Sequence, residues 1–280
     1  MWSNFHTHSH YCDGKGKIEE YLKAAADTDV VSIGFSSHAP VPFPCTWCMK
    51  QDAFADYLGE INQGRKSFPQ LEVYKGLEVD YIPNVISPFT FSDRLDYTVG
   101  SIHFVEDYEG KRWEIDNTLD VFKDGLNKIF NNDMRGAVTR YLELTREMLQ
   151  KTPPTILGHL DKIKVNALQL SFDETERWYR DEIARTIDVI SAGNTIVEVN
   201  TRGLYKKKSE TTYPSPWILE QLLDRNIRIT ISSDAHHPQD LVRNFDTTLS
   251  LLDTIGFRNL SLLQNGIWKE MPLSEYGPTC

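Results

Sequence analysis

Short apolar runs alternate along the chain with stretches that have a helical period. Seven runs have the length and β-branched content of strands: Trp2–His6, Val30–Phe35, Leu71–Leu77, Tyr97–Ile102, Thr155–Gly158, Thr195–Val199 and Arg228–Ser232. Amphipathic stretches between them predict helices, most clearly at Ile18–Asp27, Ala53–Ser67, Met134–Gln150, Thr175–Ser191 and Ser215–Arg225. This alternation predicts an α/β fold, with a parallel sheet and right-handed crossovers.

The seven units follow one another without a linker or a change of composition. We therefore expect one domain over residues 1–280, with the strands closing, or nearly closing, into a barrel. The interval after the fourth strand is longer than the others. It contains a polar turn at Asp107–Lys111 and two helical patterns, which predict a helical insertion around residues 104–152.

Histidines gather where the predicted strands end. Of the eight histidines, six end or directly follow a strand: His6, His8, His38, His103, His159 and His236. The third strand ends at a carboxylate, Glu78. Carboxyl ends of parallel strands meet on one face of a barrel, so residues far apart in the sequence converge there. One such histidine alone is most simply a core or loop residue, whereas six on one rim favour a metal site.

The number of candidate ligands favours more than one ion. Nine imidazole and carboxylate groups are expected on this rim: His6, His8, Asp13, His38, Glu78, His103, His159, Asp234 and His236. A single ion uses about four ligands. We therefore expect two or three divalent metal ions, with Glu78 bridging a pair. Mixed imidazole and carboxylate ligands suit zinc, manganese and iron.

Composition limits the partners and the location. A formal net charge of −10 argues against a nucleic-acid binder, which usually carries a basic patch. Residues 1–30 lack the basic and apolar segments of a signal peptide, and no apolar run approaches the roughly 20 residues that cross a membrane. A cytoplasmic protein without membrane contact is expected. The helix faces leave a monomer and a weak homodimer equally open.

The four cysteines do not suggest a disulfide framework in a chain of this length: Cys12, Cys45, Cys48 and Cys280. Cys45 and Cys48 have CxxC spacing, but there is no second pair to complete a zinc site, and a proline-rich segment precedes them. We expect two reduced cysteines in a loop.

The strand-end motifs together resemble the polymerase and histidinol phosphatase (PHP) superfamily. The matching motifs are His6-Thr-His8, Ser37-His38-Ala39-Pro40, Gly76-Leu-Glu78, Ser101-Ile-His103, Gly158-His159 and Ser233-Asp234-Ala-His236. Gly158-His-Leu-Asp161, Asn200-Thr-Arg-Gly203-Leu-Tyr205, Tyr213-Pro-Ser-Pro216 and Asp234-Ala-His-His-Pro238 resemble its histidinol-phosphate phosphatase branch. The resemblance runs from residue 5 to about residue 245 and implies a distorted, TIM-like (β/α)7 barrel with a trinuclear metal site.

The resemblance also implies how the ligands are divided among the metals. One metal would be held by His6, His8, Glu78 and Asp234. Glu78 would bridge to a second metal, which His103 and His159 also bind. The third would be held by Asp13, His38 and His236.

The activity that the resemblance implies is metal-dependent hydrolysis of L-histidinol phosphate to L-histidinol and phosphate, a step of histidine biosynthesis. A hydroxide bridging two metals would attack the phosphomonoester. One alternative is a PHP-type phosphoesterase for another phosphate ester or a nucleotide or phosphodiester. Another is a non-catalytic metal or phosphate binder on the same fold.

Other side chains are candidates for catalysis and binding. His38 is a candidate for a catalytic as well as a ligand role. Asp161 lies two residues past His159 and is the candidate general acid, the alternative being an ion pair with Lys162 or Lys164.

For the substrate, Arg202 suits a bidentate grip on phosphate, unless it pairs with Glu198 at the surface. His237 is a candidate substrate contact.

Less specific signals concern the rest of the substrate. Trp47 and Phe43 could wall the pocket against an imidazole ring, although aromatic residues in a proline-rich loop often only pack. Three acidic residues are unranked candidates for its ammonium group: Glu106, Glu109 and Glu114.

Overall fold

Two parallel sheets form the centre of the computed structural model, which describes residues 1–170 and 172–277. The first has the order β1-β2-β3: β1 (Trp2–Asn4), β2 (Val30–Phe35) and β3 (Glu72–Lys75). The second has the order β10-β9-β8-β5-β4: β10 (Ile229–Ser232), β9 (Ile196–Asn200), β8 (Ile156–Leu157), β5 (Val99–Ser101) and β4 (Glu78–Asp80). The predicted parallel α/β architecture is confirmed.

The two sheets meet at two seams. Isolated parallel bridges pair Thr7 with Ala235 at one seam and His38 with Glu78 at the other. At each seam one isolated bridge joins the sheets, and there is no continuous ladder of backbone hydrogen bonds between described strands. Each bridge lies next to residues predicted to bind metal, so the sheets join where the candidate site lies.

The predicted third strand is shorter than expected. β3 ends at Lys75, and Glu78 begins β4 in the second sheet, so Glu78 does not end the third strand. The chain passes between the sheets at Gly76, where the phenol of Tyr97 packs so closely that a Cβ atom would overlap its ring. Tyr97 Oη donates a hydrogen bond to the carbonyl of Phe5 at 2.8 Å, which ties this crossing to the end of β1.

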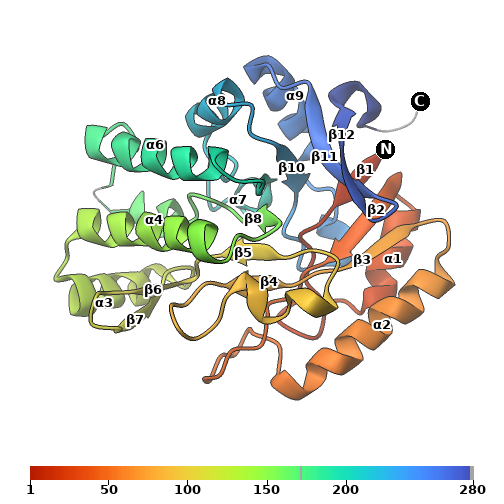
Figure 1. Cartoon of the computed structure of the whole chain (residues 1–280), viewed down its shortest axis with the longest axis horizontal. Helices are drawn as coiled ribbons and strands as arrows, with labels where there is room; N and C mark the ends of the chain where they lie inside the picture. The colour runs from red at the N-terminus through yellow and green to blue at the C-terminus, as the bar shows by residue number, and fades with distance from the viewer. Residues whose placement is uncertain (171, 278–280) are drawn as a thin grey trace.

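Helices cover the outside of the sheets. Five match the predicted ranges to within two residues: α1 (Ile18–Ala26), α2 (Phe54–Ser67), α4 (Met134–Lys151), α6 (Arg177–Ser191) and α8 (Pro216–Asp224). The other helices described are α3 (Leu119–Phe130), α5 (Lys164–Ala167), α7 (Arg202–Tyr205) and α9 (Phe245–Ile255), with single 3-10 turns η1 (Gln51–Ala53), η2 (Pro88–Thr90), η3 (Ser92–Arg94), η4 (Pro238–Asp240) and η5 (Leu273–Glu275). In Figure 1, α4, α6 and α8 lie in succession beside the second sheet, and α1 and α2 lie against the first.

The interval between β5 and β8 contains an antiparallel hairpin and two helices. The hairpin consists of β6 (Phe104–Glu106) and β7 (Arg112–Glu114), and its turn is the polar segment Asp107–Lys111. α3 packs on β7 and α4 on β6. β7 ends at Glu114, whose side chain lines the cavity described below.

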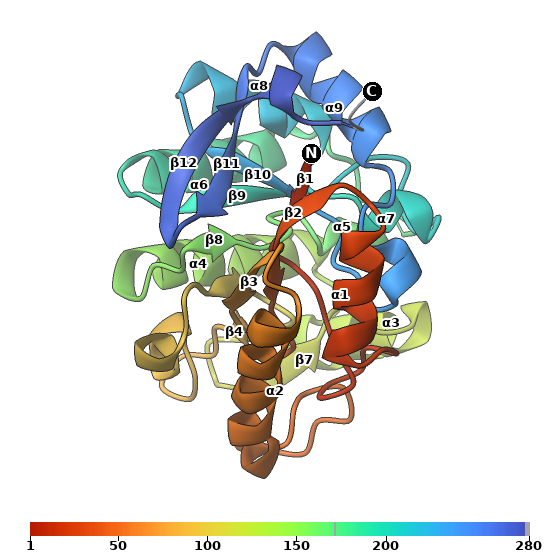
Figure 2. The same ribbon diagram turned by 90° about the vertical axis from the view of Figure 1, so that its right-hand side faces the viewer.

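A second hairpin lies at the end of the chain. It consists of β11 (Asn259–Gln264) and β12 (Ile267–Pro272), and neither strand is among the predicted ones. Figures 1 and 2 both place it beside β2, near the N terminus. Leu262 and Leu263 from β11 and Trp268 from β12 pack around Phe5, so the hairpin supports the strand that carries the first two candidate ligands.

Cys45 and Cys48 form a disulfide, so the prediction of two reduced cysteines is wrong. A tight turn brings their Cα atoms to 5.5 Å, within the range that a disulfide spans. The thiol of Cys12 is free, and Cys280 lies outside the described residues.

No helix in residues 1–170 and 172–277 has both the length and the apolar content needed to span a bilayer.

Candidate metal centre

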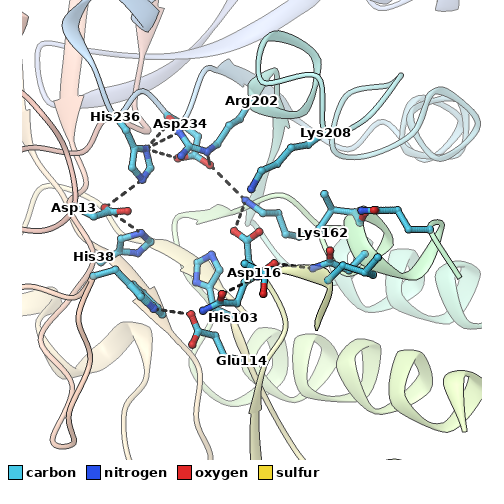
Figure 3. A pocket seen from close by; sticks show the side chains of 17 residues that line it. Asp13, His38, His103, Glu114, Asp116, Lys162, Arg202, Lys208, Asp234 and His236 are labelled. Carbon is cyan, nitrogen blue, oxygen red and sulfur yellow. Dashed lines mark hydrogen bonds and ion pairs between the residues drawn. The ribbon is translucent and has the colours of Figure 1, made fainter. Parts of the chain in front are cut away.

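The structure brings all nine predicted ligands to one end of the strands. His6 and His8 follow β1 and His38 follows β2. Glu78 begins β4, and the remaining ligands lie in the segments that follow β1, β5, β8 and β10: Asp13, His103, His159, Asp234 and His236. Eight of the nine side chains are less than 13% exposed, and Asp13 is 34% exposed. Figure 3 shows Asp13 between His38 and His236 at the mouth of the site.

The ligand atoms form three overlapping groups, and within each group the atoms lie within 4.8 Å of one another. The groups are His8, Asp13, His38 and His236; His6, His8 and Asp234; and His38, Glu78 and His103. The first group contains the three ligands expected for the third metal, Asp13, His38 and His236. The second group contains the ligands expected for the first metal, except Glu78. For the second metal, His38 stands beside Glu78 and His103, and His159 Nε2 lies 2.9 Å from Glu78 Oε1.

The atoms that would face a metal are buried and have no hydrogen-bond partner: His6 Nε2, His8 Nε2, His38 Nδ1, Asp13 Oδ1 and Asp234 Oδ1. Buried polar atoms are nearly always paired. Five buried atoms that converge without a hydrogen bond, all of ligand type, fit divalent cations in this place. The residues present therefore suit the metal site that the sequence predicts.

Glu78 lies at the middle of the group and is 1% exposed. Its oxygens lie 3.2 Å from His6 Nε2, 3.0 Å from His38 Nδ1 and 2.9 Å from His159 Nε2. Burial alone would raise the pKa of Glu78, but the surrounding imidazoles, led by His6 and His103, hold this pKa well below its usual range. Glu78 is therefore ionised and can serve two ions at once.

Two further carboxylates hold the ligand imidazoles from behind. Glu198 Oε1 lies 2.5 Å from His6 Nδ1, and Glu198 Oε2 accepts a hydrogen bond from the backbone N–H of His159 at 2.7 Å. Asp80 holds His103 in the same way, with Oδ1 3.2 Å from Nδ1. Each carboxylate directs the other ring nitrogen, Nε2, toward Glu78.

These carboxylates also set the protonation of the rings in the metal-free site. Burial alone would lower the pKa of His6, but Glu198, Glu78 and Asp234 outweigh it and raise the pKa well above its usual value. Burial alone would also lower the pKa of His103, but Asp80 and Glu78 outweigh it and raise this pKa to about 9. Metal binding at these rings must displace protons, so affinity for metal should increase with pH.

Sequence reasoning did not find the roles of Glu198 and Asp80. The signal for Asp80 is its position two residues after Glu78, which places both side chains on one face of β4. Glu198 is in the middle of the fully buried strand β9, where a carboxylate needs a partner.

A cavity of about 540 Å³ opens beside the candidate ligands. Its lining includes three cationic side chains, Lys162, Arg202 and Lys208, together with Trp47 and Glu114. Lys162 Nζ lies 3.0 Å from Asp116 Oδ2 and 3.8 Å from Asp234 Oδ2, so this cation borders the ligand group directly (Figure 3). Arg202 Nη1 donates to the carbonyl of Asp234, and it lies 2.7 Å from His236 Nδ1.

The sequence model of the PHP domain matches residues 4–202, which is most of the chain. The chain belongs to the PHP domain family. Asp234 and His236 lie beyond the matched segment, and the structure nevertheless groups them with His8, which comes from its start.

Curated relatives and a solved structure agree with this membership. A Schizosaccharomyces pombe protein named "Probable histidinol-phosphatase" is 25% identical over 93% of this chain and 89% of its own length. The Bacillus subtilis histidinol-phosphatase is 24% identical over 84% of this chain and 94% of its own. The Lactococcus lactis histidinol phosphate phosphatase, solved with zinc, L-histidinol and phosphate, superimposes with a TM-score of 0.71 at 18% identity, covering 95% of this chain and 98% of its own. This likeness shows a shared fold.

Asp161, the candidate general acid, lies inside the protein and away from the cavity. It is fully buried, and Oδ2 accepts hydrogen bonds from Lys164 Nζ at 2.7 Å and from the backbone N–H of Ser215 at 2.9 Å. It is not among the residues that line the cavity. The chain turns directly after β8, so the two-residue spacing from His159 does not continue as an extended strand. The structure thus contains the ion pair with Lys164 that the sequence offered as the alternative.

His237 also differs from its expected place. Its side chain is exposed, its Nδ1 accepts a hydrogen bond from the backbone N–H of Gln239, and it does not line the cavity. Of the acidic candidates, only Glu114 lines the cavity. Glu106 pairs with Arg112 and Glu109 with Lys111, and neither lines the cavity.

Replacement of Glu198 by glutamine should weaken metal binding roughly 10- to 100-fold, since His6 would lose the carboxylate that orients it. The measurement is competition for zinc between the metal-free protein and a chromophoric chelator. Glu182→Gln is a matched control, because Glu182 is a buried carboxylate that pairs with Arg146 instead of a ligand. Equal zinc affinity of the two variants would contradict the role of Glu198.

Proposed function

We propose that this chain is a metal-dependent phosphomonoesterase that hydrolyses L-histidinol phosphate to L-histidinol and phosphate. The observation that carries the proposal is the cavity itself, which contains members of the ligand group in its lining together with two buried or partly buried cations, an indole and a carboxylate. This arrangement offers positive charge to a phosphate, and an indole and a carboxylate to a cationic or aromatic group. The histidinol-phosphatase names of relatives that match along most of the chain support the same substrate.

Lys162 and Arg202 are the proposed phosphate contacts. Burial would lower the pKa of Lys162, but Asp116 and Asp234 outweigh it and raise the pKa, so the ammonium stays charged. The guanidinium of Arg202 is fixed by Asp234 and His236. Two fixed cations beside the ligand group can hold the oxygens of a phosphate. Because the cations are already in place, they need not move when negative charge develops on the phosphate during the reaction.

Asp116 is proposed to position Lys162. Burial would raise the pKa of Asp116, but Lys162 and His103 outweigh it and lower the pKa. Asp116 is therefore a carboxylate at neutral pH and keeps the Lys162 ammonium against the cavity at 3.0 Å. His38 lies among the candidate ligands, so its proposed role is to hold metal.

Divalent ions held by the nine ligands would supply Lewis acidity and would lower the pKa of a bound water. The surrounding residues exclude bulk water from the reacting end, where Glu78 and His159 are almost fully buried. The division of the ligands among two or three ions is proposed as in the family pattern, and zinc, manganese and iron all suit these ligands.

Trp47 and Glu114 are proposed to receive the imidazole and amino end of the substrate. Both line the cavity, and Trp47 Nε1 donates to Glu114 Oε1 at 2.8 Å. The second oxygen of Glu114 is then available to accept a hydrogen bond from the substrate. An indole face suits a flat ring or a cation.

The finer description of the fold is also proposed. The two sheets and their bridges at Thr7 and His38 support a distorted seven-stranded barrel, in which β3 and β4 together take one strand position. A cytoplasmic location, the absence of a nucleic-acid partner and a monomer or weak homodimer remain predictions.

Purified protein should release phosphate from L-histidinol phosphate in preference to a panel of sugar and nucleotide monophosphates. Prolonged chelation should abolish the release, and zinc or manganese should restore it, because the ligand group would be emptied and refilled. Phosphate release is measured by a colorimetric assay. Rapid hydrolysis of another ester with L-histidinol phosphate left intact would overturn the substrate assignment.

Lys162→Ala should lower kcat/KM for L-histidinol phosphate roughly 10- to 100-fold, because it removes one charged contact to phosphate. Lys208→Ala is the control. Lys208 is a lysine at the same cavity but is exposed, so its loss should change kcat/KM by less than about 3-fold. Steady-state kinetics measure both, and equal effects of the two substitutions would contradict the proposed phosphate site.

A further inference from the structure

The loop of residues 40–48 has little backbone support. It forms neither helix nor strand, and its ends are held where Ala39 N–H donates to the carbonyl of Glu78 at 2.8 Å and Met49 N–H to the carbonyl of His38 at 3.2 Å. Three of its residues are prolines, which have no N–H to donate: Pro40, Pro42 and Pro44. Side-chain contacts and the Cys45–Cys48 disulfide must therefore fix its conformation.

Trp47 is the part of this loop that reaches the candidate metal centre. Its ring lies edge-on to His38, with centroids 4.5 Å apart, and 5.5 Å from His103, so it touches two candidate ligands. On another side it stacks on Phe104 at 5.3 Å. Its N–H donates to Glu114, and the indole forms part of the cavity wall.

The disulfide encloses Trp47 in the sequence. Thr46 and Trp47 lie between Cys45 and Cys48, so the cross-link restricts the backbone angles that aim the indole. Cys48 is buried at 9% exposure, whereas Cys45 is partly exposed and open to attack from solvent. The bond that fixes the cavity wall is therefore within reach of a reductant.

We propose that the Cys45–Cys48 disulfide is a redox-controlled tether for Trp47, and that its reduction loosens the cavity wall and weakens substrate binding. The effect on substrate rests on the proposed function, and the tether itself rests on the geometry of the loop. The redox state of Cys45 and Cys48 would then regulate substrate binding at the cavity beside the candidate metal ligands.

The step requires a dithiol reductant. A thiolate of the reductant attacks Sγ of Cys45, the S–S bond breaks, and Cys48 leaves as a thiolate that takes up a proton. The second thiol of the reductant resolves the mixed disulfide. The protein gains two electrons and two protons, and the reductant becomes a disulfide.

Reduction should raise KM for L-histidinol phosphate roughly three- to ten-fold, the effect of losing one ordered aromatic contact. It should change kcat by less than about two-fold, because Trp47 is neither a candidate metal ligand nor a proposed phosphate contact. The metal content should not change, since neither cysteine is among the candidate ligands.

The test compares metal-loaded wild-type protein in oxidised and reduced form after the dithiol has been removed without oxygen. Alkylation and mass spectrometry establish the state of both cysteines, and metal content is measured in each sample. The indole N–H resonance of Trp47, assigned with Trp47→Phe, reports on the wall independently of activity. Cys45→Ser/Cys48→Ser is the matched control, with a raised KM that does not respond to dithiol.

A raised KM together with a shifted or broadened Trp47 resonance in the reduced wild type is the expected result. Reduced protein with unchanged KM and an unchanged resonance would overturn the tether. If no sample hydrolyses L-histidinol phosphate, the proposed function fails. The Trp47 resonance then tests the tether by itself. A resonance that changes on reduction would support the tether, and one that does not change would overturn it.

Discussion

The buried carboxylate of Glu78 is the group on which both the site and the joining of the sheets depend. Its side chain lies within hydrogen-bond or ion-pair distance of imidazoles from three separate strand ends, and Ser101 Oγ donates to it at 2.7 Å. An ionised carboxylate at 1% exposure costs several kcal/mol unless cations surround it. Its backbone also pairs with His38 across the seam between the two sheets. The same residue therefore joins the two sheets and brings the candidate ligands together.

The sequence was sufficient for the parts of the site that follow from strand geometry. β2 has the predicted bounds, and the five helices with predicted ranges differ from them by one or two residues at their ends. Because carboxyl ends of parallel strands meet, His6 and His159 could be expected together although 153 positions separate them (159 − 6). Any ligand that directly follows a strand inherits its position from that strand, and this is why the ligand group could be predicted.

Side-chain direction beyond a strand end could not be predicted in the same way. Asp161 was two residues from a ligand, but the turn after β8 directs it to Lys164, which donates to it and to Ser215 inside the protein. The disulfide depends on a tight turn between Cys45 and Cys48, and spacing alone does not show whether such a turn closes. Glu198 supports His6 from β9, a strand of the other sheet, and this contact with the residues after β1 appears only when the two sheets are assembled.

The central claim is that Glu78 and the groups around it form a multinuclear metal site in the PHP domain family. Crystal diffraction of metal-loaded protein, recorded on both sides of the zinc absorption edge, measures this directly. The account predicts two or three anomalous peaks within coordination distance of the nine ligands, with two of the ions sharing Glu78. A fully loaded crystal with no peak beside Glu78, or with metal bound elsewhere, would contradict it.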